Sequence, residues 1–461
     1  MNDVIDYNKN GVIVAPAGHG KTENIIVQIK SKNIKKKILI LTHTNIGVQE
    51  INDRAKKNNI SINKISIYTI ASFALKYIQA FPILSGYDKD KELFENDIYN
   101  QMVTLLKNKH IKEIITNTYG EIYIDEYQDC SINQHKLIKE LCGILNYKIY
   151  GDPLQSLYDF NEPPVAFDEI LRNDYELIGR LNYPWRWDKA NKELGKWILK
   201  IRERLENNKE ITLCNVPNTV NFIKTNNIDE SLRKVGYKYF QNKFSNVILT
   251  SLPYQAKKYV KIFSGKYKMQ EEIECKDLKK MIKLLDEKNK EELLIELFNI
   301  LKSAYTKMNV YNNIIEKVKR HSFDFRRLKN NRELAYLITK FINENNLYDN
   351  IISIIEFVEK QRKMNLCRMD LIILLKKILN NLKLNNEKSA VENFMVLTAN
   401  RRQKKYHFLV SRVLLVKGLQ FENVVIVEPE NMTKKEFYVA ISRATNSLTI
   451  ISKNDSIKYD N

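Results

Sequence analysis

Glycine and proline are scarce in this chain, with 13 and 9 residues among 461. The sequence accordingly has no Pro/Gly-rich linker between domains, and it has no clear internal repeat. None of the five cysteines forms a C-x-x-C pair, so their spacing argues against zinc, iron–sulfur and disulfide frameworks. Reduced thiols are expected at all of these positions, which are Cys130, Cys142, Cys214, Cys275 and Cys367.

Long apolar runs are also missing, since no stretch approaches the roughly 20 residues that a membrane-spanning helix needs. The N-terminus, MNDVIDYNKN, is polar and contains two acids, whereas a signal peptide has a basic start followed by an apolar stretch. We therefore expect a cytoplasmic protein without a membrane partner. No nuclease motif is apparent, so any cleavage of nucleic acid would have to come from a partner protein.

Positive charge is in excess: 75 Lys and Arg against 55 Asp and Glu give a formal charge of +20. A basic surface attracts phosphate backbones through Coulomb forces and counterion release, which makes nucleic acid the first partner to consider. The same excess can follow from AT-rich codon usage, because Lys, Asn and Ile are abundant together. Charge alone leaves both explanations open.

Short β-branched runs alternate with helical patterns, which predicts an α/β fold. The candidate strands of a first, mostly parallel sheet are residues 11–14, 37–41, 65–69, 121–124 and 147–150. A second α/β set is expected to begin near Tyr175, with candidate strands at 246–250, 394–398, 408–415, 423–427 and 447–451. Residues 256–387 carry apolar residues at helical spacing and little strand signal, as is typical of a helical core.

The economical interpretation is two α/β domains. The first is predicted at 1–172, with a small helical insertion at about 74–118. The second is predicted at 173–255 and 388–461, interrupted by a helical insertion at 256–387.

A phosphate-binding loop is predicted directly after the first strand. It comprises Ala15, Pro16, Ala17, Gly18, His19, Gly20, Lys21 and Thr22. Gly18 and Gly20 permit a turn whose backbone N–H groups converge on an anion, and the helix that follows adds positive potential. Lys21 can then reach the β- and γ-phosphates of ATP, and Thr22 offers a hydroxyl to Mg²⁺. Ala15 stands where this pattern usually has glycine, and His19 fills a variable position. The flanking strand and helix argue against a chance glycine turn.

Carboxylates follow the apolar strand at 121–124. At the carboxyl end of a strand, Asp125 can hold Mg²⁺, directly or through water. Glu126 can polarise the water that attacks the γ-phosphorus. An Asp-Glu pair alone is often only a solvated turn, but a phosphate loop roughly a hundred residues earlier makes this pair specific.

Eight segments, taken in order, resemble the conserved motifs of the UvrD/Rep/PcrA group of superfamily 1 helicases. Among them, DEYQD at 125–129 and GDPLQSLY at 151–158 are very similar to the motifs of the group. The others are the phosphate loop and residues 41–45, 68–73, 181–186, 417–421 and 438–444. The resemblance implies two RecA-like P-loop domains with ATP and Mg²⁺ bound between them. Within the group, the short chain resembles the helicase-like subunit of the Gabija anti-phage system.

The resemblance also implies roles for residues around the nucleotide. Arg443 and Arg186 are the candidate arginine fingers, and Gln155 is the candidate sensor of the γ-phosphate. The alternatives are a helix-surface arginine for Arg443 and an arginine stacked on aromatic rings for Arg186. Gln420 replaces the glutamate that contacts the ribose in the family. No glutamine that would read adenine precedes the loop, so the base selectivity stays open.

Contacts to single-stranded or partly duplex DNA are implied in the same way. Thr44, Asn45 and Phe73 are expected to line the channel on the first domain. Tyr158 and Phe160 are the candidate stacking platforms, with burial in the core as the alternative for both. The three tryptophans, at 185, 187 and 197, are expected to pack between elements rather than to stack on bases.

Two functions remain open at this point. In the first, the protein is a DNA-dependent ATPase that moves 3′→5′ along single-stranded DNA, in anti-phage defence or DNA repair. In the second, its ATPase is a DNA-sensing switch that regulates a partner nuclease, with little unwinding of its own. RNA is a third and weaker option, because nothing in the sequence reads a 2′-hydroxyl.

Overall fold

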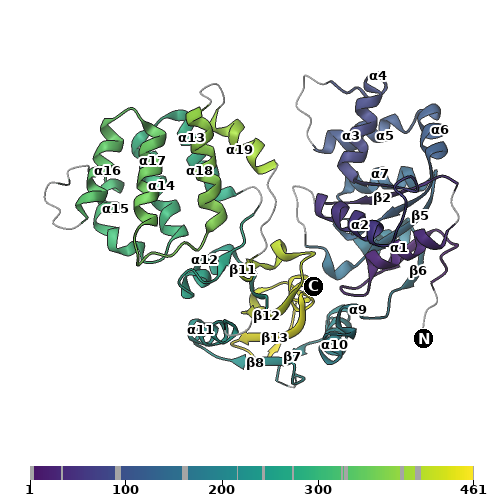
Figure 1. Ribbon diagram of the computed structural model, residues 1–461. Helices are drawn as coiled ribbons and strands as arrows, with labels where there is room; N and C mark the ends of the chain where they lie inside the picture. The colour runs from purple at the N-terminus through teal and green to yellow at the C-terminus, as the bar shows by residue number, and fades with distance from the viewer. Residues whose placement is uncertain are drawn as a thin grey trace. The chain divides into compact units, whose positions relative to one another are not determined.

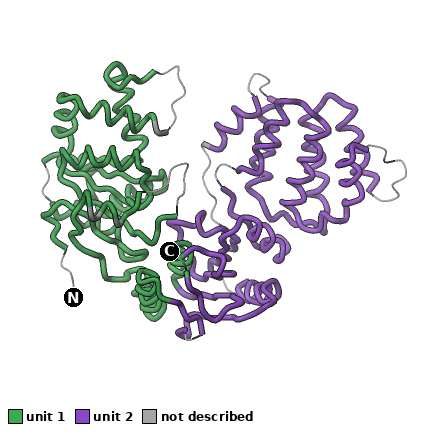
Figure 2. The backbone as a smooth tube through the Cα atoms, turned by 180° about the vertical axis from the view of Figure 1, so that it is seen from behind, with its two compact units in different colours: residues 1–209, 434–445, 459–461 green, residues 210–433, 446–458 purple. Residues whose placement is uncertain are grey.

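The computed structural model describes residues 5–32, 35–88, 95–157, 165–214, 216–240, 244–272, 275–322, 325, 331–384, 389–399 and 406–459 (Figure 1). The chain divides into two compact units, which Figure 2 colours separately. Unit 1 comprises residues 1–209, 434–445 and 459–461, and unit 2 comprises 210–433 and 446–458. Within the described ranges, no helix is long and apolar enough to cross a membrane.

Unit 1 is built on a parallel sheet of six strands in the order β3-β2-β4-β5-β1-β6. In chain order the strands are β1 Gly11–Val14, β2 Lys37–Thr42, β3 Ile65–Thr69, β4 Tyr119–Ile124, β5 Asn146–Gly151 and β6 Leu177–Arg180. The carboxyl ends of β4, β5 and β1 lie side by side, which is where an open α/β sheet binds its ligands.

Both faces of this sheet are buried, because successive side chains of each strand point to opposite sides. On β2, Leu39 and Leu41 join one apolar cluster, while Ile38 and Ile40 join the other. Helices α1 and α2 supply the second cluster, and α3, α5, α6 and α7 supply the first. The longer helices of unit 1 are α1 Lys21–Ser31, α2 Asn45–Lys57, α3 Ile70–Ala80, α5 Glu95–Leu105, α6 Lys109–Thr118, α7 Ile132–Cys142 and α10 Lys192–Glu206.

Shorter elements complete unit 1. They are α4 Pro82–Ser85, α8 Phe167–Asn173, α9 Trp185–Asp188, α20 Lys434–Ile441 and the 3-10 helices η1 Tyr127–Asp129 and η2 Pro153–Gln155. Helix α20 lies far along the chain but belongs to unit 1 (Figure 2).

The second sheet, in unit 2, also has six strands, in the order β10-β11-β9-β12-β13-β8. In chain order these strands are β8 Val220–Lys224, β9 Asn246–Thr250, β10 Lys268–Met269, β11 Phe408–Arg412, β12 Phe421–Val427 and β13 Ala444–Ser452. Each of the pairs β10–β11, β11–β9, β9–β12 and β13–β8 is parallel. Its flanking helices are α11 Ile228–Tyr239 and α12 Pro253–Ile262, followed by η5 Val413–Val416 and η6 Pro429–Asn431. Strands β7 Ile211–Thr212 and β14 Ser456–Ile457 form a separate antiparallel pair.

A group of helices is inserted between β10 and β11, and these two strands are still neighbours in the sheet. The inserted helices are η3 Lys276–Leu278, α13 Lys279–Glu287, α14 Lys290–Ala304, η4 Met308–Tyr311, α15 Asn312–Lys319, α16 Arg332–Asn343, α17 Leu347–Glu359, α18 Met369–Leu384 and α19 Ala390–Ala399. They share one apolar core of their own and lie side by side in Figure 1. The expected α/β fold with two RecA-like sheets and a helical second insertion is therefore confirmed.

Three strand predictions differ from the structure. The strand predicted at 408–415 ends at Arg412, and residues 413–415 belong to the 3-10 helix η5. Residues 394–398 belong to helix α19, in which Ala390 and Phe394 are buried one turn apart while Met395 and Val396 are exposed. The buried residues therefore recur four positions apart, as in a helix, and not every second position, as in a half-buried strand. The strand after Tyr175 is β6, and it pairs with β1 of the first sheet instead of opening a second set. The first sheet thereby extends past the predicted boundary at residue 172.

Candidate functional site

The phosphate loop connects β1 to α1, and its two central glycines are both required by geometry. Gly18 and Gly20 have φ angles of 75° and 78°, in the left-handed region that disfavours other residues. Space is restricted as well. A Cβ atom at Gly18 would lie 2.9 Å from Cβ of Arg186, and one at Gly20 would lie 2.9 Å from Cδ1 of Trp185. The loop is thus held against α9, which follows the end of β6.

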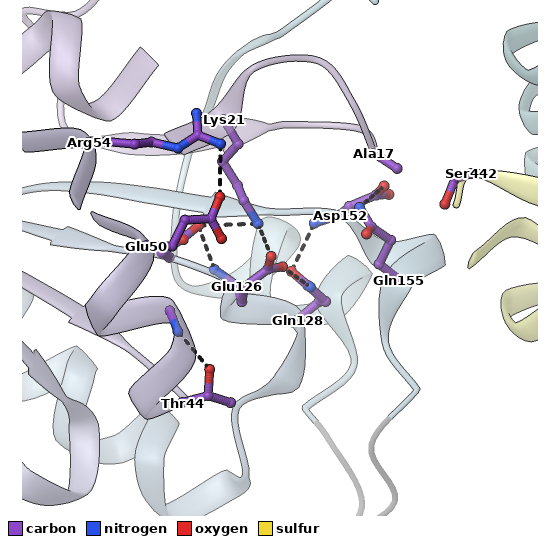
Figure 3. A network of polar contacts seen from close by, with 12 residues as sticks. Ala17, Lys21, Thr44, Glu50, Arg54, Glu126, Gln128, Asp152, Gln155 and Ser442 are labelled. Carbon is purple, nitrogen blue, oxygen red and sulfur yellow. Dashed lines mark hydrogen bonds and ion pairs between the residues drawn. The ribbon is translucent and has the colours of Figure 1, made fainter. Parts of the chain in front are cut away.

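Lys21, the first residue of α1, extends to the acidic end of β4 (Figure 3). Its Nζ lies 3.1 Å from Oδ1 of Asp125 and forms an ion pair with Oε1 of Glu126. Burial opposes the charge of Lys21, but the two carboxylates outweigh it and raise the pKa of the ammonium. Burial also raises the pKa of Asp125 to about 6, against the opposing effect of Lys21. One ammonium group and two carboxylates therefore lie together, largely shielded from water, at the carboxyl end of β4.

Glu126 adopts a strained backbone conformation. Its φ of 58° is in the left-handed region, which costs a residue with a side chain about 1–2 kcal/mol. The N–H of Glu126 donates to Oδ1 of Asp125 over 3.0 Å, so the turn is tied to the neighbouring carboxylate. Strain of this kind is found at functional sites, where the surrounding structure holds it in place.

A chain of hydrogen bonds leads from Glu126 to the end of β5 (Figure 3). Nε2 of Gln128 donates to Oε2 of Glu126 over 2.6 Å, and Oε1 of Gln128 accepts from the N–H of Asp152 over 3.0 Å. Oδ2 of Asp152 then accepts from Nε2 of Gln155 over 2.8 Å. The carboxylate proposed as the general base and the amide proposed as the sensor are thus joined by defined contacts.

Helix α9 and the residues that follow α20 bring two arginines to the same place. Nη2 of Arg443 donates to Oε1 of Gln155 over 3.4 Å and to Oγ of Ser442 over 2.9 Å. Arg186, on α9, donates through Nη1 to the carbonyl of Ser442. Burial lowers the pKa of Arg443 to about 10, and burial together with the charge of Arg443 lowers the pKa of Arg186 to about 9. Two buried cations so close together favour an anion between or beside them.

The structure brings most of the residues predicted for the nucleotide into one region of unit 1. Ala15, Pro16 and Ala17 are buried in the loop, and Thr22 is half-buried in the first turn of α1. His19 is also buried, with Nδ1 2.9 Å from the carbonyl of Ala17, and burial lowers its pKa. Gln420 is exposed just before β12 of unit 2.

Of the residues predicted to contact DNA, some are exposed, one is buried, and the others lie outside the described residues. Thr44 and Asn45 are exposed at the start of α2, where Oγ1 of Thr44 accepts from the N–H of Gly47 over 3.0 Å (Figure 3). Phe73 does not fit its prediction, because its side chain is 0% exposed and its ring centre lies 5.0 Å from that of Tyr77. It belongs to the core under the sheet. Tyr158 and Phe160 lie outside the described residues.

Sequence reasoning missed three features of the site. Trp185 was expected to pack between elements, but it is 63% exposed beside the loop glycine Gly20. Tyr438 accepts a hydrogen bond from the N–H of Ala17 through its hydroxyl, over 3.2 Å. Arg202 forms an ion pair with Asp152. Tyr438 lies within a recognised motif and could have been singled out, whereas no local pattern marks Arg202.

Comparison with known proteins agrees with this geometry. Residues 2–97 and 85–176 match the family model of the UvrD/REP helicase N-terminal domain. This N-terminal part of the chain is therefore similar to the N-terminal domain of UvrD/REP helicases. The match covers the phosphate loop, the two carboxylates and Gln155.

Three curated proteins are relatives to which parts of the chain are similar. The ATP-dependent DNA helicase Rep of Buchnera aphidicola is 30% identical over 117 residues, which is 25% of this chain and 17% of that protein. One subunit of the ATP-dependent helicase/nuclease of Streptococcus suis is 24% identical over 237 residues, which is 51% of this chain and 17% of that protein. The Gabija protein GajB of Bacillus cereus is 25% identical over 215 residues, which is 38% of this chain and 43% of that protein. Each alignment thus spans less than half of the relative's own length.

Proposed function

We propose that this protein is a DNA-dependent ATPase of the superfamily 1 helicase type, which couples ATP hydrolysis to 3′→5′ movement on single-stranded DNA. The observation that carries the proposal is the convergence of Lys21, Glu126, Gln155 and Arg443 around one phosphate loop. The match of residues 2–176 to the UvrD/REP helicase N-terminal domain and the net charge of +20 support it. The sequence-predicted domains, which are 1–172, 173–255 with 388–461, and 256–387, remain part of the proposal.

The donor set at the loop fits ATP with Mg²⁺. Mg²⁺ prefers hard oxygen ligands and takes only one or two from protein, with phosphates and water as the rest. Asp125 and the hydroxyl of Thr22 are such donors, and no cluster of three or more metal-ligating side chains occurs among the described residues. We assign Mg²⁺ to these two residues. When bound, the ion would neutralise charge on the phosphates.

Each remaining residue then has a defined task. The backbone of the loop and Lys21 hold the phosphates, and Glu126 orients and deprotonates the attacking water. Gln155, Arg186 and Arg443 stabilise charge that develops on the γ-phosphoryl group. For Arg186, a buried Nε without a hydrogen-bond acceptor supports this role, because such a donor costs stability unless it meets a ligand. Gln420 is retained as a ribose contact, and Thr44 and Asn45 as DNA contacts.

We also assign the nucleotide base to Trp185. Its ring is exposed, touches the phosphate loop at Gly20, and lies 4.4 Å from the ring of Tyr183. An aromatic face in this place can bind adenine without the upstream glutamine that the UvrD/Rep/PcrA group uses.

Trp185→Ala is expected to raise the KM for ATP and to leave kcat close to wild type. Stacking of a base on an aromatic ring contributes about 1–3 kcal/mol, which corresponds to a roughly 5- to 150-fold rise in KM. Steady-state kinetics with Trp185→Phe, which keeps a stacking face, and with Tyr336→Ala, which removes an exposed aromatic on α16, provide the comparison. A Trp185→Ala protein with unchanged KM would rule out the base contact.

Single-stranded DNA is expected to stimulate ATP hydrolysis, and the stimulation should weaken as salt rises. Phosphate contacts release counterions on binding, so the DNA affinity falls with ionic strength. The test is a steady-state ATPase assay with DNA, with RNA of the same sequence and without nucleic acid, across a salt series. Equal rates in all three arms at low salt would contradict a nucleic-acid-dependent ATPase, and stimulation by RNA alone would contradict DNA as the substrate.

A second function has support from the names of the relatives. One of them is part of a helicase/nuclease, and another belongs to the Gabija system. The alternative is therefore a DNA-sensing ATPase that regulates a partner nuclease in anti-phage defence. A translocation assay and a duplex-unwinding assay on the same preparation separate the two functions. Movement with unwinding supports the motor, whereas DNA-stimulated turnover without either supports the switch.

A further inference from the structure

Arg202, on α10, lies outside every motif that the sequence analysis recognised, and yet its side chain is only 5% exposed. Two contacts join it to Asp152, whose side chain is fully buried. Nη1 donates a hydrogen bond to Oδ2 over 2.9 Å, and Nη2 forms an ion pair with Oδ1 over 2.8 Å without hydrogen-bond geometry. Oδ1 also accepts from the N–H of Leu154 over 3.2 Å, so Arg202 and this N–H together fix the position and the rotation of the carboxylate.

The fixed carboxylate in turn determines how Gln155 is oriented. Oδ2 of Asp152 accepts from Nε2 of Gln155 over 2.8 Å, so the NH₂ end of the amide is directed to Asp152. Its oxygen then faces Nη2 of Arg443, 3.4 Å away. If the Asp152 carboxylate were free to rotate, this orientation of the amide would lose its support.

Arg202 also contacts the element that touches the phosphate loop. Its guanidinium lies over the ring of Tyr438, 4.9 Å from the ring centre, and the hydroxyl of Tyr438 accepts from the N–H of Ala17 over 3.2 Å. A third contact, 2.9 Å from Nη2 to Oε1 of Glu206, lies on the same helix. Arg202 thus connects the end of β5 with α20 and, through it, with the loop.

Stability alone gives a weak reason for this arrangement. Replacing a buried ion pair by apolar residues is often neutral or stabilising, because both charges have lost their hydration. Burial opposes the charge of Arg202, but the carboxylate of Asp152 outweighs it and raises the pKa of the guanidinium. Arg202 therefore stays charged at any physiological pH, and its contribution is a fixed geometry rather than a titration.

We propose that Arg202 is a positioning residue for ATP hydrolysis, which acts by holding Asp152 so that the amide of Gln155 faces the γ-phosphate and Arg443. The inference rests on the proposed ATPase function and adds a residue to it. The hydrogen bonds and ion pairs of Arg202 go to Asp152 and Glu206 and not to the phosphate loop, so its loss is expected to affect kcat rather than KM.

The test compares Arg202→Met and Arg202→Lys with wild type and with Lys200→Met, which removes an exposed cation from the same helix. For Arg202→Met, kcat is expected to fall about 10- to 100-fold, as when a positioning group is displaced, with KM for ATP unchanged. Arg202→Lys keeps the charge and should recover part of this loss. Melting temperatures and the folded fraction are measured for each protein, so that all rates refer to folded molecules.

A double-mutant cycle shows whether Arg202 acts through Gln155. In a Gln155→Ala background, adding Arg202→Met should change kcat by less than about twofold, because the group that it positions is already absent. Equal kcat per folded molecule for Arg202→Met and wild type would overturn the inference, and so would full additivity in the cycle. A wild-type protein without ATP turnover would instead contradict the proposed function, which separates the two failures.

Discussion

Replacing Lys21 with alanine is expected to abolish ATP turnover, with a loss of about 100- to 1,000-fold or more. Lys21 supplies the ammonium that meets the phosphates, and it is held between Asp125 and Glu126 at the end of β4. The measurement is steady-state hydrolysis beside nucleotide binding, and both should fail together. Lys30→Ala is the matched control, because it removes an exposed lysine from the same helix.

The fold is expected to survive this substitution. Without Lys21 the attraction that lowers the pKa of Asp125 disappears, so this pKa rises further and the uncharged carboxyl, which does not repel Glu126, is favoured. A circular dichroism spectrum and a cooperative thermal transition would verify that the protein is folded. A folded Lys21→Ala protein with near wild-type hydrolysis would refute the assignment of the loop.

Glu126→Gln is expected to bind ATP and to hydrolyse it about 100- to 10,000-fold more slowly, which is the usual contribution of a general base. The amide keeps nearly the shape of the carboxylate and can still contact Gln128, but it cannot accept a proton from water. Binding of a fluorescent ATP analogue and single-turnover hydrolysis measure the two effects separately.

The control for this variant is Glu140→Gln, on the exposed side of α7. It removes the same charge away from the nucleotide and should leave both measurements unchanged. If Glu126→Gln lost ATP binding as completely as Lys21→Ala, the role of Glu126 would be phosphate or metal binding rather than base catalysis.

The sequence by itself determined the parts of this protein that depend on neighbouring residues. The phosphate loop could be predicted because a strand, two glycines and Lys-Thr specify its geometry within a dozen positions. Asp125 and Glu126 could be placed because the end of an apolar strand fixes where the next side chains emerge. The α/β fold and the helical insertion followed from hydrophobic periodicity, which is a local property as well.

Only the tertiary structure decided which partner each segment meets. A run such as 394–398 fits a strand or a helix equally well in isolation, and its contacts with α13 and α18 decide for the helix. The same holds for β6, whose apolar residues predict a strand but not the sheet that it joins. Phe73 lies in a motif that implies DNA contact, yet its ring is buried in the core between α3 and the sheet.

Arg202 and Trp185 are two residues of the site whose roles could not be predicted from the sequence. One is a buried arginine paired with Asp152, 50 positions away in the chain, and the other is an exposed tryptophan against a loop glycine. Burial, pairing and exposure are set by free energies summed over elements distant in sequence, and no local pattern contains them. The sequence determined the chemistry available at the sheet edge, while the packing of α9, α10 and α20 around it decided how that chemistry is oriented.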